Sequence, residues 1–228
     1  AFGGSDRAHH SFTPMQKAIN YAMTSFFTTG GIRGQKKGMD KFYPRSFNMG
    51  VRREVYNALG GFSNMRFGED IDFSTRIFKG GYRCRLFPEA WVYHKRRTDL
   101  RKFFKQVHNS GIARIHLSRR HPGTHKLVHL LPAIFTLGVV FLLLSAVLLA
   151  IFGHGCLALT ALSPLFLFSL LIGLDATRRE HSLGVGCRAV AAAFVQLLGY
   201  GSGYLRAWWQ CRVLHSGEFE AFSDSFYQ

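Results

Sequence analysis

Acidic side chains are scarce in this chain. Its 228 residues hold 13 Asp and Glu against 29 Lys and Arg, a formal net charge of +16. Cysteine is scarce as well, and the four cysteines form no CxxC pair, which excludes a small secreted disulfide framework. No signal peptide opens the sequence, and its first residue is Ala1 rather than Met. We therefore expect an N-terminal part of the protein to be missing from this chain.

The excess positive charge is confined to the first half. Residues 1–126 contain 24 Lys and Arg and 8 Asp and Glu, whereas residues 127–228 contain five of each kind. Nearly all the long apolar runs lie in the second half, and a hydrophobic content of 47% excludes intrinsic disorder. Because charge and apolarity separate along the chain, we predict two domains, 1–126 and 127–228, rather than one soluble domain.

Three apolar runs in the second half are candidates for membrane helices. Residues 130–152 and 156–174 are uncharged runs of 23 and 19 residues, and about 20 apolar residues are needed to cross a bilayer core. The third run, 189–205, is interrupted by Gln196 and a stretch of small residues, which allow close helix contacts. It suits a third span, or else an interfacial helix or a buried soluble helix. We predict two to three transmembrane helices.

The loops between these runs predict an orientation. Lys and Arg precede the first run and recur in the 175–184 loop, whereas the 153–155 turn has none. The positive-inside rule then places residues 1–126 and the 175–184 loop in the cytoplasm. The acidic C-terminal tail (Glu218, Glu220, Asp224) would face outward if the third run spans, and inward if it lies in the interface.

Periodicity and breakers predict the elements of the basic half. Apolar spacing of three and four residues indicates amphipathic helices, and paired glycines indicate helix ends. The last helix before the membrane is basic and aromatic, as expected of a segment that contacts anionic lipid. The expected elements are a helix over 12–29, a basic loop over 30–38, a helix over 52–62, a helix opened by the acids near residue 70, short strands around Pro88, and a helix over 99–120.

The densest acidic cluster of the basic half lies in the segment Gly68-Glu69-Asp70-Ile71-Asp72. Three of the eight acids of residues 1–126 fall within these positions, at the start of an expected helix. Acids favour the first turn of a helix because of its dipole, which is one explanation. The other is functional: a carboxylate here meets a cationic group or accepts a proton as a general base. The residues alone leave both explanations open.

A family resemblance rests on four segments in order. NMGVRREVYNALGGF, GEDIDFSTRIFKGGYR, PEAWVYHKRR and DLRKFFKQVHNSG, followed by hydrophobic runs, resemble the C-terminal part of glycosyltransferase family 2. The likeness covers residues 10–210 and is strongest to membrane-bound bacterial members of the exopolysaccharide and succinoglycan type. It implies an α/β fold, with residues 1–126 as the acceptor-binding C-terminal half of a GT-A domain. It also implies the bacterial inner membrane, with the catalytic part facing the cytoplasm.

The resemblance implies a reaction and a base. Family members are hexosyltransferase-type enzymes that transfer a sugar, with inversion, from a nucleotide-sugar donor to an acceptor. Here the acceptor would be lipid-linked or a saccharide, in polysaccharide or glycolipid synthesis. The family's catalytic base maps onto Asp70, while Glu69 would lie beside the acceptor or orient the base. Asp72 would cap the helix or pair with Arg76 one turn on.

The resemblance also suggests further site residues. His94 lies where some members complete the shell of a divalent cation, Mg²⁺ or Mn²⁺, although the Asp-x-Asp motif that mainly holds it belongs to the half missing here. Asn48, Arg52 and Arg53 match a region that contacts acceptor or phosphate. Gln106 matches a Gln-x-x-Arg-Trp motif whose Arg and Trp are absent, which favours transfer of a single sugar. The alternatives are a His94 that bonds its own loop and a solvated start of the 52–62 helix.

Other functions remain as rival hypotheses. The chain could be a non-catalytic basic accessory or scaffold protein anchored in the membrane. A nucleic-acid partner is not expected, because no recognised motif is present and the basic residues peak beside the first apolar run, where anionic lipid explains them. An ion path is not expected either, because the first two runs carry no ionisable residue. Without a nucleotide-binding half, we expect the chain alone to be inactive.

Overall fold

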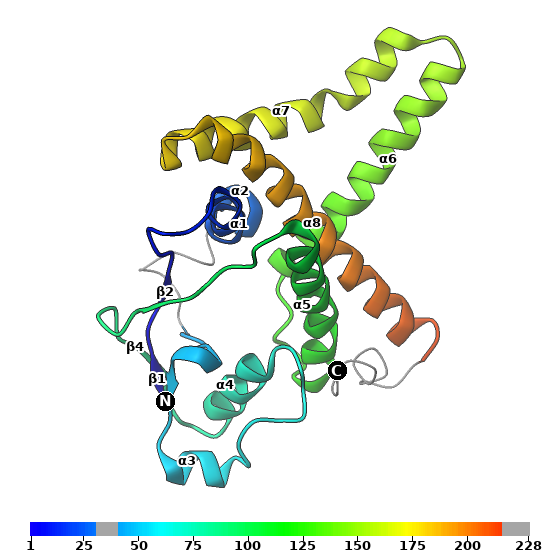
Figure 1. Cartoon of the computed structure of the whole chain (residues 1–228). Helices are drawn as coiled ribbons and strands as arrows, with labels where there is room; N and C mark the ends of the chain where they lie inside the picture. The colour runs from blue at the N-terminus through cyan, green and yellow to red at the C-terminus, as the bar shows by residue number, and fades with distance from the viewer. Residues whose placement is uncertain (31–40, 216–228) are drawn as a thin grey trace.

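A computed structural model describes residues 1–30 and 41–215 (Figure 1). The described part is mostly helical, and its strands are two residues long. The helices are α1 (Pro14–Thr24), α2 (Phe26–Thr29), α3 (Arg53–Ala58), α4 (Glu69–Lys79), α5 (Leu100–Arg120), α6 (Leu131–Ile151), α7 (Gly155–Glu180) and α8 (Leu183–Arg212), with 3₁₀ turns η1 (Ser46–Asn48) and η2 (Leu127–His129). The strands are β1 (Phe2–Gly3), β2 (Asp6–Arg7), β3 (Met49–Gly50), β4 (Arg85–Leu86) and β5 (Val92–Tyr93).

Two small sheets hold the start of the chain against later segments. In the first, β1 lies between β3, which is antiparallel to it, and β4, which is parallel. In the second, β2 pairs in parallel with β5. The expected strands around Pro88 are therefore present, but they are too short to form the layer of an α/β sandwich. A GT-A fold remains a prediction, and the described residues form helices edged by these two ribbons.

The sequence located the helices of the basic half well. The helix expected over 12–29 is divided at Ser25, which ends α1 and caps α2. The expected helix over 52–62 is the shorter α3, followed by Gly60 and Gly61, both with positive φ. The basic loop predicted over 30–38 lies outside the described residues except for Gly30, and the acidic C-terminal tail lies outside them entirely.

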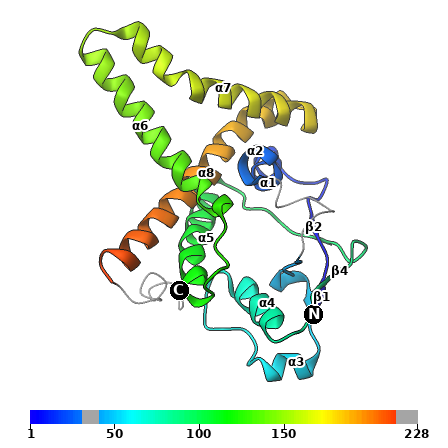
Figure 2. The ribbon, with the colours of Figure 1, turned by 180° about the vertical axis from the view of Figure 1, so that it is seen from behind.

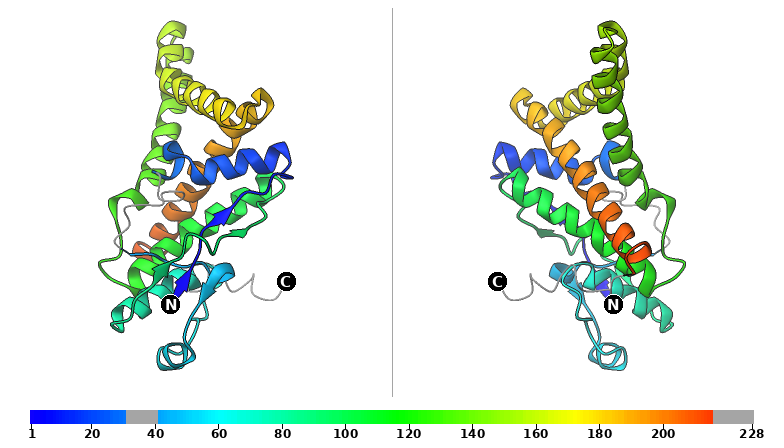
Figure 3. Two further views of the ribbon diagram at one scale, coloured as in Figure 1. Left: turned by 90° about the vertical axis from the view of Figure 1, so that its left-hand side faces the viewer. Right: turned by 90° about the vertical axis from the view of Figure 1, so that its right-hand side faces the viewer.

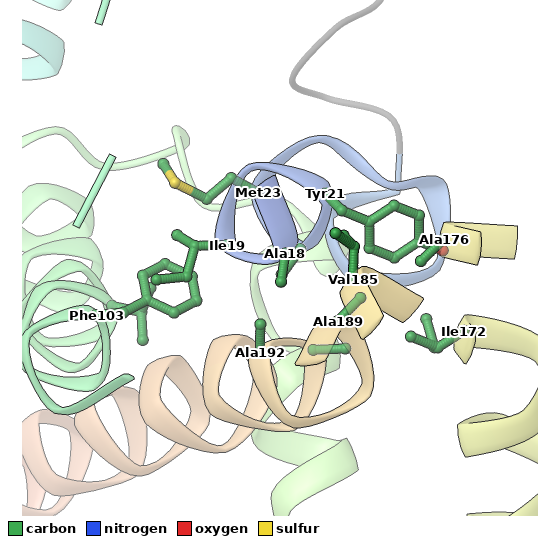
Figure 4. Packing of buried hydrophobic residues seen from close by; sticks show 13 residues of the cluster. Ala18, Ile19, Tyr21, Met23, Phe103, Ile172, Ala176, Val185, Ala189 and Ala192 are labelled. Atoms are coloured by element: carbon green, nitrogen blue, oxygen red, sulfur yellow. The ribbon is translucent and has the colours of Figure 1, made fainter. Parts of the chain in front are cut away.

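The main hydrophobic core lies where α1 meets α5, α7 and α8. Small side chains of α1 and α8, such as Ala18 and Ala189, bring these two helices close together (Figure 4). Phe103 of α5 and Ile172 of α7 close the cluster from either side, and both are fully buried. The basic half and the apolar half of the sequence therefore share one core.

The crossing of α5 and α8 is the most extensive helix contact of the fold, and glycines make it possible. A Cβ atom added to Gly203 would overlap the carbonyl oxygen of His108, and one added to Gly111 would overlap that of Tyr200. The backbones of α5 and α8 therefore touch directly. The small-residue stretch in the third apolar run thus serves close helix packing, as its composition predicts.

Helices α6 and α7 form a hairpin that projects from the rest of the molecule (Figures 1 and 2). By length and composition α6, α7 and α8 could each cross a membrane. The most apolar windows of α6 and α7 are only 11% buried, against 39% for α8. The hairpin thus presents its apolar surface outward, as a membrane-embedded hairpin does, whereas α8 is partly covered by protein.

Candidate functional site

The acidic cluster forms the first turn of α4. Gly68 is the N-cap, with φ of 82°, a left-handed conformation that favours glycine. It leaves Glu69, Asp70 and Asp72 inside the helix rather than at its cap. Asp70 is 8% exposed and Asp72 is 0% exposed. Such burial is unusual for carboxylates unless cations or donors accompany them, so their partners decide what each can do.

The start of the 3₁₀ turn η1 lies against Glu69 and Asp70. The guanidinium of Arg45 lies 3.3 Å from the Oδ2 atom of Asp70, and the hydroxyl of Ser46 donates to Glu69 at 3.2 Å. Burial raises the pKa of Glu69 above its usual value, and the neighbouring charge of Asp70 adds to the rise despite opposing hydrogen bonds. Two adjacent carboxyl groups therefore have different surroundings, one paired with a cation and one with a hydroxyl.

Asp72 is the centre of a buried ionic network. Arg76 approaches its Oδ2 atom at 2.9 Å, one helical turn on, as the spacing predicts. Arg120 and His121, from the end of α5, approach its Oδ1 atom at 3.5 and 2.8 Å. Burial alone would raise the pKa of Asp72, but interactions with Ser63, His121 and Arg76 hold it below its usual range. Asp72 is therefore an ionised link between α4 and α5, and it does not cap its helix.

The contacts of His121 fix its tautomer. Its Nε2 atom faces the Asp72 carboxylate, and its Nδ1 atom lies 3.2 Å from the Lys79 ammonium, which has no acceptor capacity. A neutral imidazole that donates from Nε2 and accepts at Nδ1 satisfies both contacts. His121 thereby joins the first and last turns of α4 to the end of α5. The acidic first turn is therefore fixed relative to α5, the helix that precedes α6.

His94 follows β5 and lies beside the 3₁₀ turn η1. Its ring stacks on Phe47 with centroids 4.1 Å apart, and its Nδ1 atom lies 3.4 Å from a guanidinium nitrogen of Arg96. Because an arginine only donates, Nδ1 is the accepting nitrogen. Nδ1 is therefore engaged by Arg96.

The side chains around His94 and the acidic turn do not make a cation site. In residues 1–30 and 41–215, His, Cys, Asp and Glu do not come together in any group of three that could hold a metal ion. His94 offers at most one nitrogen, and Asp72 is committed to Arg and His. These residues therefore do not by themselves fit a metal centre. A metal ligand role for His94 stays a prediction.

The predicted acceptor-binding residues divide into two kinds. Asn48 donates to the carbonyl oxygen of Ala90 at 2.7 Å, so it ties η1 to the loop before β5. Arg52 and Arg53 are exposed at the start of α3 and are available to an anionic group. Gln106 accepts from the Nε atom of Arg97 at 3.0 Å. Within the described part of the chain, no hydrogen bond or ion pair links these four side chains, and their binding roles stay predictions.

Sequence reasoning missed the cations that organise the site. Arg45, Arg120 and His121 had no local signal, because their acidic partners lie 25, 48 and 49 residues away. Arg96 was also missed. It is 6% exposed, pairs with Asp6 at 2.5 Å and donates to Asn20 at 3.0 Å, which connects β2, α1 and the segment after β5. A buried arginine among three elements is a positioning group.

Comparison with known proteins identifies the family. The family described as glycosyl transferase family group 2 matches residues 19–174. The pre-mycofactocin glycosyltransferases of two Mycobacterium tuberculosis strains, CDC 1551 / Oshkosh and ATCC 25618 / H37Rv, are 36% identical over 72 residues. That stretch covers 31% of this chain and only 15% of each relative. No solved structure matches the chain. Because the family match spans more than half of its length, the chain belongs to glycosyl transferase family group 2.

Proposed function

We propose that this chain is the acceptor-side and membrane-anchoring part of an inverting glycosyltransferase, with Asp70 as its general base. The observation that carries the proposal is the arrangement at the first turn of α4. Asp70 is nearly buried, is paired with Arg45, and lies next to Glu69, which has a raised pKa. Paired carboxyl groups in different surroundings are a recurring basis for acid–base chemistry.

The proposed reaction is a single displacement. An acceptor hydroxyl attacks the anomeric carbon of a nucleotide sugar and forms the new C–O bond, while the bond to the nucleoside diphosphate breaks. The Asp70 carboxylate accepts the hydroxyl proton. The pairing with Arg45 matches the ionised carboxylate that a base requires, and Glu69 orients the acceptor. Exposed Arg52 and Arg53 provide positive charge for an anionic acceptor or its phosphate.

The setting of the reaction is part of the proposal. The donor is a nucleotide sugar, and the acceptor is lipid-linked or a saccharide presented at the membrane, in polysaccharide or glycolipid synthesis. Anionic lipid meets the basic helix α5, and the site faces the cytoplasm at the bacterial inner membrane. The closeness of α4 to α5 supports this setting, because the Asp72 network ties the acids to the helix that leads into the membrane. A divalent cation would be held mainly by residues outside this chain.

The test is an Asp70→Asn substitution in the full-length protein. The change keeps the shape of the side chain but removes its ability to accept a proton, and general-base catalysis contributes about 10²–10⁴-fold in rate. We expect kcat for sugar transfer to fall by that factor, with binding of the nucleotide sugar retained. Donor hydrolysis and acceptor transfer should be followed separately.

Asp99→Asn is the matched control. Asp99 is partly exposed and caps α5 by accepting from the backbone N–H of Lys102 at 2.7 Å. Asparagine caps a helix about as well as aspartate, so this variant should transfer sugar at the parent's rate. If Asp70→Asn keeps the parent's turnover, Asp70 is not the base. An equal loss in both variants would mean that folding, not chemistry, had been measured.

A further inference from the structure

The third apolar helix, α8, does not extend toward the far end of the α6–α7 hairpin. Figures 1 and 3 show α8 crossing the open end of the hairpin, while the turn that joins α6 to α7 lies away from it. The question left open by the sequence is whether α8 spans the membrane or lies along it. Its contacts with the hairpin decide between the two.

These contacts lie near the end of α7 and the beginning of α6. A Cβ atom on Gly186, near the start of α8, would overlap Thr177 and the carbonyl oxygen of Gly173, both in the last turns of α7. A Cβ atom on Gly201 would overlap Thr136 and the carbonyl oxygen of Pro132, in the first turns of α6. In a hairpin that crosses a membrane once in each direction, these two regions lie at the same membrane surface.

Helix α8 therefore bridges two points at one surface. Gly201 follows Gly186 by fifteen positions, which is about 22 Å along a helix. Phe194, between them, reaches into the mouth of the hairpin, where its ring lies 5.9 Å from Phe135 of α6 and 5.6 Å from Phe168 of α7. The three helices form a triangle whose base is α8.

Two helices from the basic half of the chain, α1 and α5, cover the other face of α8. Helix α1 packs on its first half through the core that contains Ala18 and Ala189, and α5 packs on its second half from Gly199 onward. Helix α5 carries six Lys and Arg in its 21 residues. If α8 spanned the membrane, this packing would pull α5 and its charges into the hydrocarbon core, where each ionised side chain costs several kcal/mol.

We infer that α8 is not a third span but lies along the membrane surface, on the same side as α1 and α5, with its free face in the lipid headgroup region. That face carries the exposed side chains of Arg188, Arg206, Trp208 and Trp209. Trp is enriched at the membrane–water interface, and Arg can keep its charged group in water there. The partner of this surface is the bilayer itself. The inference rests on the proposed insertion of the α6–α7 hairpin but not on sugar transfer.

The test compares the side from which three single cysteines react. Alanine replaces the four native cysteines of the full chain, and Lys41→Cys, Phe152→Cys and Leu214→Cys are made one at a time. All three positions are exposed. A membrane-impermeant maleimide is applied to sealed vesicles of each orientation. We expect Leu214→Cys to react from the same side as Lys41→Cys, and Phe152→Cys from the opposite side.

Each other outcome has a defined meaning. Reaction of Leu214→Cys from the side of Phe152→Cys would show that α8 crosses the bilayer and would overturn the inference. Reaction of Lys41→Cys and Phe152→Cys from one side would show that the hairpin does not cross. The proposed membrane insertion would then fail, and the inference with it, while the assignment of Asp70 would stand.

Measuring how deep α8 lies in the bilayer tests the inference independently of Leu214→Cys. Spin labels are placed at Ala191→Cys, exposed on α8, and at Val140→Cys, exposed in the middle of α6. Oxygen concentrates in the centre of a bilayer, whereas polar relaxation agents stay at its surface. We expect the α8 label to be reached mainly by the polar agent and the α6 label mainly by oxygen. Equal oxygen access at both sites would overturn the inference.

Discussion

The acidic start of α4 and the α6–α7 hairpin differ in what they bury. At α4, Asp72 is fully buried and four polar partners surround its carboxylate. In the hairpin, large apolar side chains such as Phe141 and Leu144 are 68% and 59% exposed. Both arrangements follow one rule, that a side chain is placed by the solvent around it. Exposure of apolar residues in α6 therefore suits a lipid environment, whereas burial of acids in α4 requires a network of partners.

The two regions also differ in how their helices are held together. Ion pairs join α4 to α5, and such pairs are directional and sensitive to charge. Backbone contacts at glycines join α8 to α5 and to the hairpin, and these are sensitive to volume alone. Substitutions that change charge but not shape, or shape but not charge, should separate the two kinds of contact.

The largest effect on stability is expected from Asp72→Asn. The substitution keeps the side-chain volume but leaves Arg76 and Arg120 without their shared anion. Removing one partner of a buried ion pair is strongly destabilising, and because both arginines are partly exposed we expect a loss of about 3 kcal/mol, the lower end of the usual range. The unfolding midpoint of the purified full-length protein in detergent measures it. A midpoint equal to that of Asp99→Asn would mean that the network contributes nothing.

The acid dependence of the same variant sharpens the test. The pKa of Asp72 lies below its usual range. The stabilisation from its charge is therefore present above the unfolded-state pKa of about 3.9 and is lost as the pH falls through the lower folded-state pKa. Asp72→Asn lacks this contribution, so the difference in stability between parent and variant should shrink toward low pH. A constant difference would assign the effect to lost hydrogen bonds rather than to charge.

The next effect is expected from volume at the α5–α8 crossing. Gly203→Leu forces a side chain against the His108 backbone, and overpacking of this kind costs about 1–3 kcal/mol. Gly138→Leu is the matched control, because the space around Gly138 in α6 is open. Unfolding midpoints in detergent should fall for the first variant only. Equal midpoints would mean that α5 and α8 do not touch through their backbones.

The smallest effect is expected where α1 meets the α6–α7 hairpin. Tyr21 of α1 donates to the Asp175 carboxylate at the end of α7, at 2.6 Å. Burial, together with this hydrogen bond, raises the pKa of Tyr21 to about 12. Tyr21→Phe should lower stability by about 1.5 kcal/mol, as expected for a hydrogen bond to a charged group. Tyr82→Phe, at an exposed ring, should change little, and an equal change in both would exclude a role for the Tyr21 bond.

Helices were predictable here because their signals are local. The runs behind α6 and α7, the acidic start and glycine end of α4, and the Asp99 cap of α5 are all visible within a few residues. The strands were less predictable, since β1 and β2 are two residues long and depend on partners more than 40 residues away. No alternating pattern can develop over two residues.

The site was predictable only within one helical turn. The spacing of Asp72 and Arg76 indicated their ion pair, and the family resemblance singled out Asp70. The contacts of Asp70 with Arg45 and of Asp72 with His121 depend on tertiary structure, which charge counts do not reveal. The third apolar run was ambiguous for the same reason, because its composition suits a span but does not exclude an interfacial helix. Only its contacts with α1, α5 and the hairpin ends separate the two.

The direct backbone contact between α5 and α8 has a consequence for substrate choice. If α8 lies on the bilayer as proposed, α5 is held at a fixed height, and the Asp72 network fixes the first turn of α4 relative to α5. The Asp70 carboxylate would then stand at a set distance from the lipid phosphates. The protein would then select acceptors by the distance between their membrane anchor and their reactive hydroxyl.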